Sequence, residues 1–242
     1  MFRFPIIIIL VALWPTIGQA KEVKMTVAGS PPYVFAESNT GIVMDILREA
    51  LAFKGHEFVP VIVPVKRVVY EFKLGNVDAA AISQGLDEGG KAHYKSETSV
   101  TYYDFFFTLA ERNLKIQAPE DLNDLKIVSF PIASKVYPNW LVKVEEESRY
   151  TELPDQLAQL KMLYRGRADA VLADENIIKY LANRLASDSG QPKKELTVST
   201  SPGNLSSIPV FWDQEVRDDF NAGIRHLRET DRYQAIIDKY TK

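Results

Sequence analysis

The chain has 242 residues, of which 46% are hydrophobic and 25% are charged, and its formal net charge is −3. This is the composition of an ordinary globular protein, long enough for one large domain or two modest lobes. The slightly negative charge and the lack of a strongly basic stretch argue against a nucleic-acid-binding role. The absence of cysteine excludes disulfides, thiolate metal sites, cysteine nucleophiles and a lipid anchor on an N-terminal cysteine.

The first twenty residues have the pattern of a signal peptide. Arg3 provides a positive start, residues 6–13 form an apolar run (IIIILVAL), and residues 18–20 (GQA) provide a small-residue end. We expect cleavage after Ala20. The apolar run is too short to span a bilayer comfortably, although an uncleaved anchor is the alternative. The mature protein is therefore expected in the periplasm.

The next segment alternates between strand and helix patterns. Residues 23–28 (VKMTVA) alternate in hydrophobicity, and apolar residues recur at helical spacing over 42–51. A strand over 58–63, a short helix over 68–74 and a buried strand over 78–83 (DAAAIS) are predicted to follow. Such alternation is typical of βαβ units and predicts a mostly parallel sheet.

The pattern recurs after an aromatic, extended run at residues 102–110 (YYDFFFTLA), which we expect to be buried between lobes. The alternative is that one or two of its aromatic residues contact a ligand directly. The other predicted elements, in order, are a short helix from Pro119, a strand over 125–130, a helix from a Ser134 cap to Val144, a helix over 153–164, a strand over 169–173, a helix over 174–185, strands over 196–199 and 208–212, and one or two helices over 213–240.

One short pattern occurs twice. Residues 74–79 (LGNVDA) and 164–170 (YRGRADA) both combine a helix end, a glycine, two further residues, Asp-Ala and an apolar strand. Two similar α/β lobes are therefore predicted. Ligands of open parallel sheets lie beyond the carboxyl ends of the strands. Ser83-Gln84 and Asp174-Glu175 follow the two strands, so both pairs are expected to border one cleft if the lobes face each other.

Motifs of the common enzyme classes are absent from the sequence. It contains no G-x-S-x-G, phosphate-binding loop, G-x-G-x-x-G or H-E-x-x-H pattern. The three histidines, His56, His93 and His226, are scattered in polar surroundings and are expected at the surface. No cofactor and no metal site are therefore expected.

The order of several motifs resembles a known family. The segments are residues 31–35 (PPYVF), 41–46 (GIVMDI), 74–79 (LGNVDA), 120–127 (EDLNDLKI), 166–174 (GRADAVLAD) and 220–240. Together they resemble the family 3 extracellular solute-binding proteins, which include the amino-acid receptors of ABC importers. The resemblance implies an α/β, two-lobed periplasmic-binding-protein-like type II fold. Each lobe would be a mostly parallel sheet flanked by helices, and two hinge strands would join the lobes.

The resemblance also implies how the chain is divided. Lobe 1 would comprise residues 21–108 and 205–242, and lobe 2 residues 109–204. The strand pair near residues 107–110 and 196–201 would form the hinge. Lobe 1 would contribute Tyr33, an aromatic at the mouth that covers the ligand, and Ser83, a hydrogen-bonding residue beside Gln84.

In lobe 2 the resemblance implies both an anion site and a carboxylate. Phe130, Ser134 and Lys135 fall at a strand end and helix start, where backbone N–H groups favour an anion. Asp174 corresponds to the carboxylate that holds a ligand's ammonium group. The alternative role of Asp174 is a helix N-cap.

One departure from the family pattern concerns the ligand. Amino-acid receptors of the family carry an arginine after the lobe 1 strand, which binds the ligand's α-carboxylate through two hydrogen bonds. An ungapped comparison places Gly90 there, so Lys91 or Arg67 would have to replace the arginine. Glu88 and Asp174 together would suit a cationic or amine-bearing ligand.

The resemblance implies a monomeric binding protein rather than an enzyme. It would capture a small polar or charged ligand, amino-acid-like or amine-bearing, by hinge closure for an ABC importer. Its partner would be a membrane permease or the outer domain of a sensor. The alternatives are an orphan sensory or accessory binding protein, or a dehydratase-like enzyme in which Glu88, Glu175 or Asp174 acts as the acid.

Overall fold

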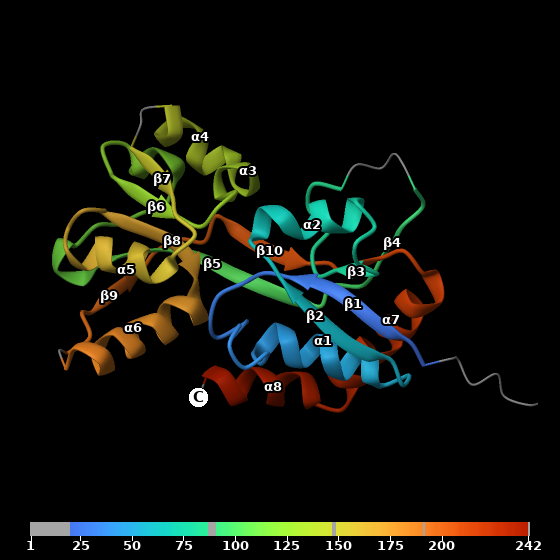
Figure 1. Ribbon diagram of the computed structural model, residues 1–242. Coiled ribbons are helices and arrows are strands. Elements are labelled where there is room, and N and C mark those ends of the chain that lie inside the picture. Colours follow the sequence, from blue (N-terminus) through green and yellow to red (C-terminus); the bar gives the residue numbers. More distant parts are fainter. Residues whose placement is uncertain (1–19, 87–90, 147–148, 191, 242) are drawn as a thin grey trace, which may run out of the picture.

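The computed structural model describes residues 20–86, 91–146, 149–190 and 192–241. The expected signal peptide lies outside these ranges, apart from its last residue, Ala20. No helix in the described part of the chain has the length and apolar character needed to cross a membrane. Two sheets flanked by helices lie side by side and form two lobes (Figure 1).

The first lobe is built on a five-stranded sheet in the order β2-β1-β3-β11-β4. Its strands are β1 (Glu22–Val27), β2 (Glu57–Ile62), β3 (Ala79–Ala80), β4 (Tyr94–Lys95) and β11 (Val210–Phe211). β1 pairs in parallel with β2 and β3, whereas β11 runs antiparallel to β3 and β4. The parallel βαβ arrangement predicted for this part of the chain is therefore present.

Helices cover both faces of this sheet. They are α1 (Ile42–Ala52), α2 (Val65–Lys73), α7 (Gln214–Glu229) and α8 (Arg232–Thr241). α1 and α8 lie below the sheet in Figure 1, with α7 packed against both, and α2 lies on the opposite face. Gly223 allows the close approach of α7 to α1, because a Cβ atom there would lie 2.0 Å from the carbonyl oxygen of Ala50.

A buried carboxylate joins the C-terminal helix to α1. Asp45 accepts hydrogen bonds from Lys239 Nζ at 2.8 Å and Tyr240 OH at 2.6 Å, and it also pairs with Arg48. Burial opposes ionisation of Asp45, but the bonds from Lys239 and Tyr240 outweigh it and hold its pKa below the usual range. The C-terminal segment therefore completes the first lobe.

The second lobe is built on a six-stranded sheet in the order β10-β5-β8-β6-β7, with β9 paired to β5. Its strands are β5 (Val100–Leu109), β6 (Ile127–Ser129), β7 (Tyr150–Glu152), β8 (Ala170–Asp174), β9 (Leu196–Val198) and β10 (Gly203–Ser207). β6, β7 and β8 are parallel, whereas β5 is antiparallel to β8. Every residue of β8 is buried, as expected for a strand covered on both faces.

Helices on the two faces of this sheet bury two separate apolar clusters. The helical elements of the lobe are α3 (Ala133–Val136), α4 (Pro138–Glu146), α5 (Gln156–Tyr164), α6 (Glu175–Ser189) and the short 3₁₀ turns η1 (Ala110–Arg112) and η2 (Pro119–Leu122). Alternate residues of β8 face opposite sides. Leu172 packs with the α3–α4 side, whereas Val171 packs in the cluster that includes α5 and α6.

The two lobes are joined by β5 and β10, which run antiparallel to each other between the sheets (Figure 1). Residues 108–109 and 204–205, where the lobe boundaries are predicted, lie within these two strands. β10 is absent from the predicted elements because its sequence, GNLSS, is polar and resembles a loop. The predicted hinge partner, residues 196–201, instead begins with β9, which pairs with β5 at the far end of the second sheet.

The repeated sequence pattern has the same structure in both lobes. Its glycine adopts a left-handed conformation in each copy. Asp78 accepts a hydrogen bond from the backbone N–H of Lys24 at 2.9 Å, and Asp169 accepts the equivalent bond from Lys126 at 2.9 Å. Each aspartate therefore fixes the start of one strand, β3 or β8, against its parallel neighbour.

The helix expected from Ser134 to Val144 is divided into α3 and α4. The break falls at Tyr137, just before Pro138, whose ring disfavours a helical conformation of the preceding residue. Ser134 lies inside α3 rather than at its cap, and Ile132 precedes the helix with φ of 74°. A left-handed conformation is strained for a β-branched residue, so the surrounding contacts must hold Ile132 in place.

Candidate ligand-binding site

A cavity of about 430 Å³ lies between the two lobes. Most of its lining comes from the segments that follow the parallel strands of both sheets: residues 28–30 after β1, 63–66 after β2, 82 and 84 after β3, 130–132 after β6, 152, 154 and 156 at and after β7, and Asp174 at the end of β8. The carboxyl ends of the strands of both lobes therefore face one space, which is where open α/β sheets bind ligands.

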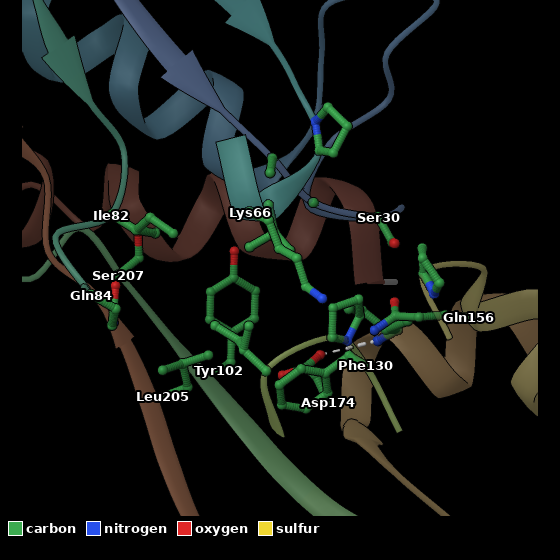
Figure 2. Close-up of a pocket in the computed structure, with 18 of the residues that line it drawn as sticks. Ser30, Lys66, Ile82, Gln84, Tyr102, Phe130, Gln156, Asp174, Leu205 and Ser207 are labelled. Atoms are coloured by element: carbon green, nitrogen blue, oxygen red, sulfur yellow. Dashed lines mark hydrogen bonds between the residues drawn. The ribbon is translucent and has the colours of Figure 1, made fainter. Parts of the chain in front are cut away.

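Most of the cavity wall is apolar. Val63 and Ile82 contribute from the first lobe, Phe130 and Ile177 from the second, and Leu205 from the crossing strand β10 (Figure 2). The volume and the apolar wall with a few polar groups are typical of sites for small molecules. The polar groups therefore determine which molecule fits.

Asp174 lines the cavity, but its oxygens are fully engaged. Oδ1 caps α6 by accepting bonds from the backbone N–H groups of Asn176 and Ile177, at 2.9 and 3.1 Å. Oδ2 accepts bonds from Tyr33 OH at 3.1 Å and from the N–H of Tyr103 at 2.9 Å. Burial raises the pKa of Asp174 despite these donors. The N-cap role considered for Asp174 is thus observed, and it leaves little capacity for a ligand.

Asp104 is a second buried carboxyl, opposite Asp174 in the β5–β8 pair, and it also lines the cavity. Its Oδ2, rather than its Oδ1, accepts a hydrogen bond from Tyr137 OH at 2.6 Å. Burial raises the pKa of Asp104 to about 7; the bond from Tyr137 lowers it and the charge of Asp174 raises it. Asp104 was not among the site residues predicted from the sequence. The signal that could have identified it is its position as the single acidic residue in the aromatic run at residues 102–110.

Glu152, at the end of β7, occupies the anion site that was expected at the start of the lobe 2 helix. Its Oε2 accepts the backbone N–H of Ile132 at 2.7 Å. Its Oε1 accepts the N–H and the hydroxyl of Ser134 and the hydroxyl of Tyr150, each at 3.1 Å. Burial favours the neutral acid, but these donors outweigh it and lower the pKa of Glu152. Glu152 is therefore an anion at the cavity wall.

Among the described residues, Lys66 is the cationic residue that lines the cavity. It begins α2 in the first lobe, and its side chain reaches into the cavity toward Phe130 and Asp174 (Figure 2). Arg67, the neighbouring residue proposed as a replacement for the missing arginine, forms an ion pair with Glu71 one turn along α2. Successive helical residues point about 100° apart, and of these two only Lys66 lines the cavity.

Two glutamines add unused acceptors to the lining. Gln84 donates its amide to the carbonyl of Ser206 at 2.6 Å, and its own Oε1 is buried without a partner among the described residues. The Oε1 atom of Gln156 is also buried and unpartnered in that part of the chain. Both residues line the cavity. Unpaired buried acceptors are costly unless a ligand or water satisfies them.

Of the residues proposed from the sequence, three line the cavity: Gln84, Phe130 and Asp174. Tyr33 does not line it; its ring is buried against Tyr102, with centroids 4.6 Å apart, and its hydroxyl bonds to Asp174 across the lobes. Sequence reasoning also missed Glu152 and Lys66, because which residues of a loop or helix start face a cleft depends on packing.

The remaining proposed residues lie elsewhere. Ser83 is buried beside Gln84, and Lys135 is exposed on α3. The Nζ atom of Lys91 lies 4.6 Å from the ring centre of Trp212. Ser134 does not line the cavity, but its backbone N–H and hydroxyl donate hydrogen bonds to Glu152, which does. Glu88 lies outside the described residues.

No protein-family model matches the sequence, and no curated protein matches it. Solved structures do match. The ligand-binding core of GluR0 in complex with L-glutamate is 14% identical, with a TM-score of 0.72, and the match covers 93% of this chain and 100% of that one. A histidine kinase sensor domain with similarity to periplasmic binding proteins is 17% identical, with a TM-score of 0.71 and coverage of 90% and 95%.

A third match is AbpA from Streptococcus pneumoniae, an amino-acid ABC transporter substrate-binding protein bound to L-arginine. It is 16% identical, with a TM-score of 0.69, and the match covers 92% of this chain and 94% of that one. At such identities the matches show a shared fold. The chain has the two-lobed, periplasmic-binding-protein-like fold expected from the sequence.

Proposed function

We propose that this chain is a periplasmic solute-binding protein that captures a small polar or charged ligand between its lobes and presents it to an ABC importer. The observation that carries the proposal is the cavity. The strand ends of both lobes line it, and the two connecting strands, β5 and β10, form part of its wall. A ligand that contacts both lobes binds the closed arrangement better than the open one and shifts the population toward it.

The similar structures support a binding role over an enzymatic one. All three are described as binding proteins or as ligand-binding or sensor domains. Two of the carboxyl groups considered as catalytic acids, Asp174 and Glu175, do not favour the dehydratase alternative. Asp174 is engaged by four donors, and Glu175 forms an ion pair with Lys179 at 2.6 Å instead of lining the cavity.

A sensory role is the second candidate, because the sensor domain of a histidine kinase has the same fold. The two roles differ in what deletion of the gene does. Loss of the importer receptor abolishes uptake of the solute, whereas loss of a sensor receptor abolishes the transcriptional response and leaves uptake intact. Uptake of a labelled solute by the deletion strain, with and without the restored gene, separates them.

Ligand binding and closure are tested on purified, ligand-stripped protein. A solute at a hundred times its Kd stabilises the folded state by about 2.7 kcal/mol, which raises the Tm by several degrees. Small-angle scattering at the same concentration should show a smaller radius of gyration. Stabilisation without compaction would contradict closure, and no stabilisation by any amine, amino acid, carboxylate, sugar or peptide would contradict the binding function.

A further inference from the structure

We propose that the cleft selects a small organic amine without an α-carboxylate, and that Glu152 is the residue that excludes the carboxylate. This inference rests on the proposed function and names its ligand class. Three features of the cavity wall support it. The carboxylate of Glu152 occupies an anion site, buried hydrogen-bond acceptors have no partner among the described residues, and the side chain of Lys66 can move out into solvent.

The first feature is the position of Glu152. The backbone N–H groups of Ile132 and Ser134, with the hydroxyls of Ser134 and Tyr150, form a cluster of donors at the cavity wall. Such a cluster suits one carboxylate, and the carboxylate of Glu152 occupies it. A ligand carboxylate at this place would meet a like charge, and it would find these donors engaged.

The second feature is the chemistry of the remaining polar atoms. The Oε1 atoms of Gln84 and Gln156 are buried and have no hydrogen-bond partner among the described residues, and the bond from Tyr137 engages Oδ2 of Asp104 rather than Oδ1. Asp104 is 2% exposed and Gln156 9% exposed, so neither is well solvated. All three atoms are acceptors when Asp104 is ionised. An ammonium group carries three donors and no acceptor, and therefore complements this set better than a carboxylate does.

The third feature is the placement of charge. Glu152, Asp104 and Asp174 line the cavity, while Lys66 is the lysine on its wall among the described residues. The three carboxyls are held by packing and hydrogen bonds. Lys66 is exposed, and its flexible stem allows it to move into solvent when a cation enters. A ligand with its own carboxylate would instead bind Lys66, so the effect of removing this residue distinguishes the two ligand classes.

The experiment compares amines with the amino acids that differ from them only by the α-carboxylate. The pairs are cadaverine and lysine, agmatine and arginine, histamine and histidine, tyramine and tyrosine, and phenethylamine and phenylalanine. Thermal unfolding of the ligand-stripped protein identifies the pair that binds, and calorimetry then measures both Kd values. We expect the amine to bind at least about tenfold more tightly than its amino acid, as for a charged hydrogen bond gained or lost.

Two variants and one control assign the preference to named residues. Glu152→Ala frees the donor cluster, so the amino acid should gain affinity and the preference should shrink by about tenfold or more. Lys66→Ala should tighten amine binding, because it removes a like charge from the cavity wall. Glu175→Gln, which removes a carboxylate next to Asp174 but outside the cavity lining, should leave the preference unchanged.

The outcomes separate this inference from the proposed function. Tighter binding of the amino acid to the wild-type protein, or loss of binding in Lys66→Ala, would overturn the inference and leave the solute-binding function standing. An amine preference that persists in Glu152→Ala would overturn the role of Glu152. If no amine binds but a sugar or a simple carboxylic acid does, the inference fails alone. If no solute of any class binds, both proposals fail.

Discussion

The two lobes of this protein begin their central strands in the same way and end them differently. In each lobe an aspartate of the repeated motif, Asp78 or Asp169, accepts the backbone N–H of the neighbouring strand. At the other end of these strands the first lobe presents Gln84, whereas the second lobe presents Asp174 and, from β7, Glu152. The scaffold is therefore repeated, while the carboxyl groups of the cleft are concentrated on the second lobe.

The lobes also differ in how the chain completes them. The second lobe is formed by residues between the two crossing strands, whereas the first needs β11, α7 and α8 from the C-terminal segment. The packing of α7 on α1 therefore joins distant parts of the sequence. Perturbing this contact should affect the first lobe more than the second.

The largest effect on stability is expected at Gly223. A Cβ atom there would lie 2.0 Å from the carbonyl oxygen of Ala50, so Gly223→Ala must push α7 away from α1. We expect a loss of about 3 kcal/mol in the free energy of unfolding, the upper range for overpacking. Urea denaturation measures it. Glu229→Ala, at the exposed end of the same helix, should change it by less than about 0.5 kcal/mol. Equal effects of the two variants would show that the helix contact is not close.

The next largest effect is the pH dependence of stability that Asp104, a carboxyl of the second lobe, should cause. The pKa of Asp104 is raised to about 7 in the folded protein, from an ordinary value of 3.8 for an aspartate. Between these values the folded state holds a proton that the unfolded state has lost, so this group's contribution to stability falls as pH rises and is constant above about pH 7.

Asp104→Asn removes this pH dependence and keeps an acceptor for Tyr137. Relative to wild type, the variant should gain on the order of 2 kcal/mol in unfolding free energy between about pH 4.5 and pH 8. Urea denaturation at several pH values measures the gain. Asp188→Asn, at an exposed position on α6, should show none. A flat difference for Asp104→Asn would contradict a raised pKa.

The smallest effect compares the repeated motif between the lobes. Asp78→Ala and Asp169→Ala each remove one bond to a backbone N–H, which is worth about 1 kcal/mol. The second substitution should cost more, because Asp169 also pairs with Arg112 at 2.8 Å and is less exposed. Amide hydrogen exchange can assign each loss to its own lobe. A loss of protection spread equally over both lobes would contradict independent motifs.

Most elements of the fold were predictable, because their signals are local. Hydrophobic spacing located α1, and Gly75 and Gly166 marked the helix ends before β3 and β8. β10 was not predictable from its own residues, since GNLSS carries no apolar alternation and becomes a strand only by pairing with β5. Tyr137 likewise interrupts a helical pattern because Pro138 follows it.

The sequence by itself determined which loops border the cleft, since the segments that follow parallel strands must gather at one edge of each sheet. Its resemblance to the amino-acid receptors also predicts that the arginine typical of those receptors is missing, because Gly90 falls at the corresponding position. Only the tertiary structure decided which side chains line the cavity. Lys66 rather than Arg67, the unforeseen Asp104, and Glu152 on the donors near Ser134 all depend on packing between segments distant in the sequence, which no local pattern records.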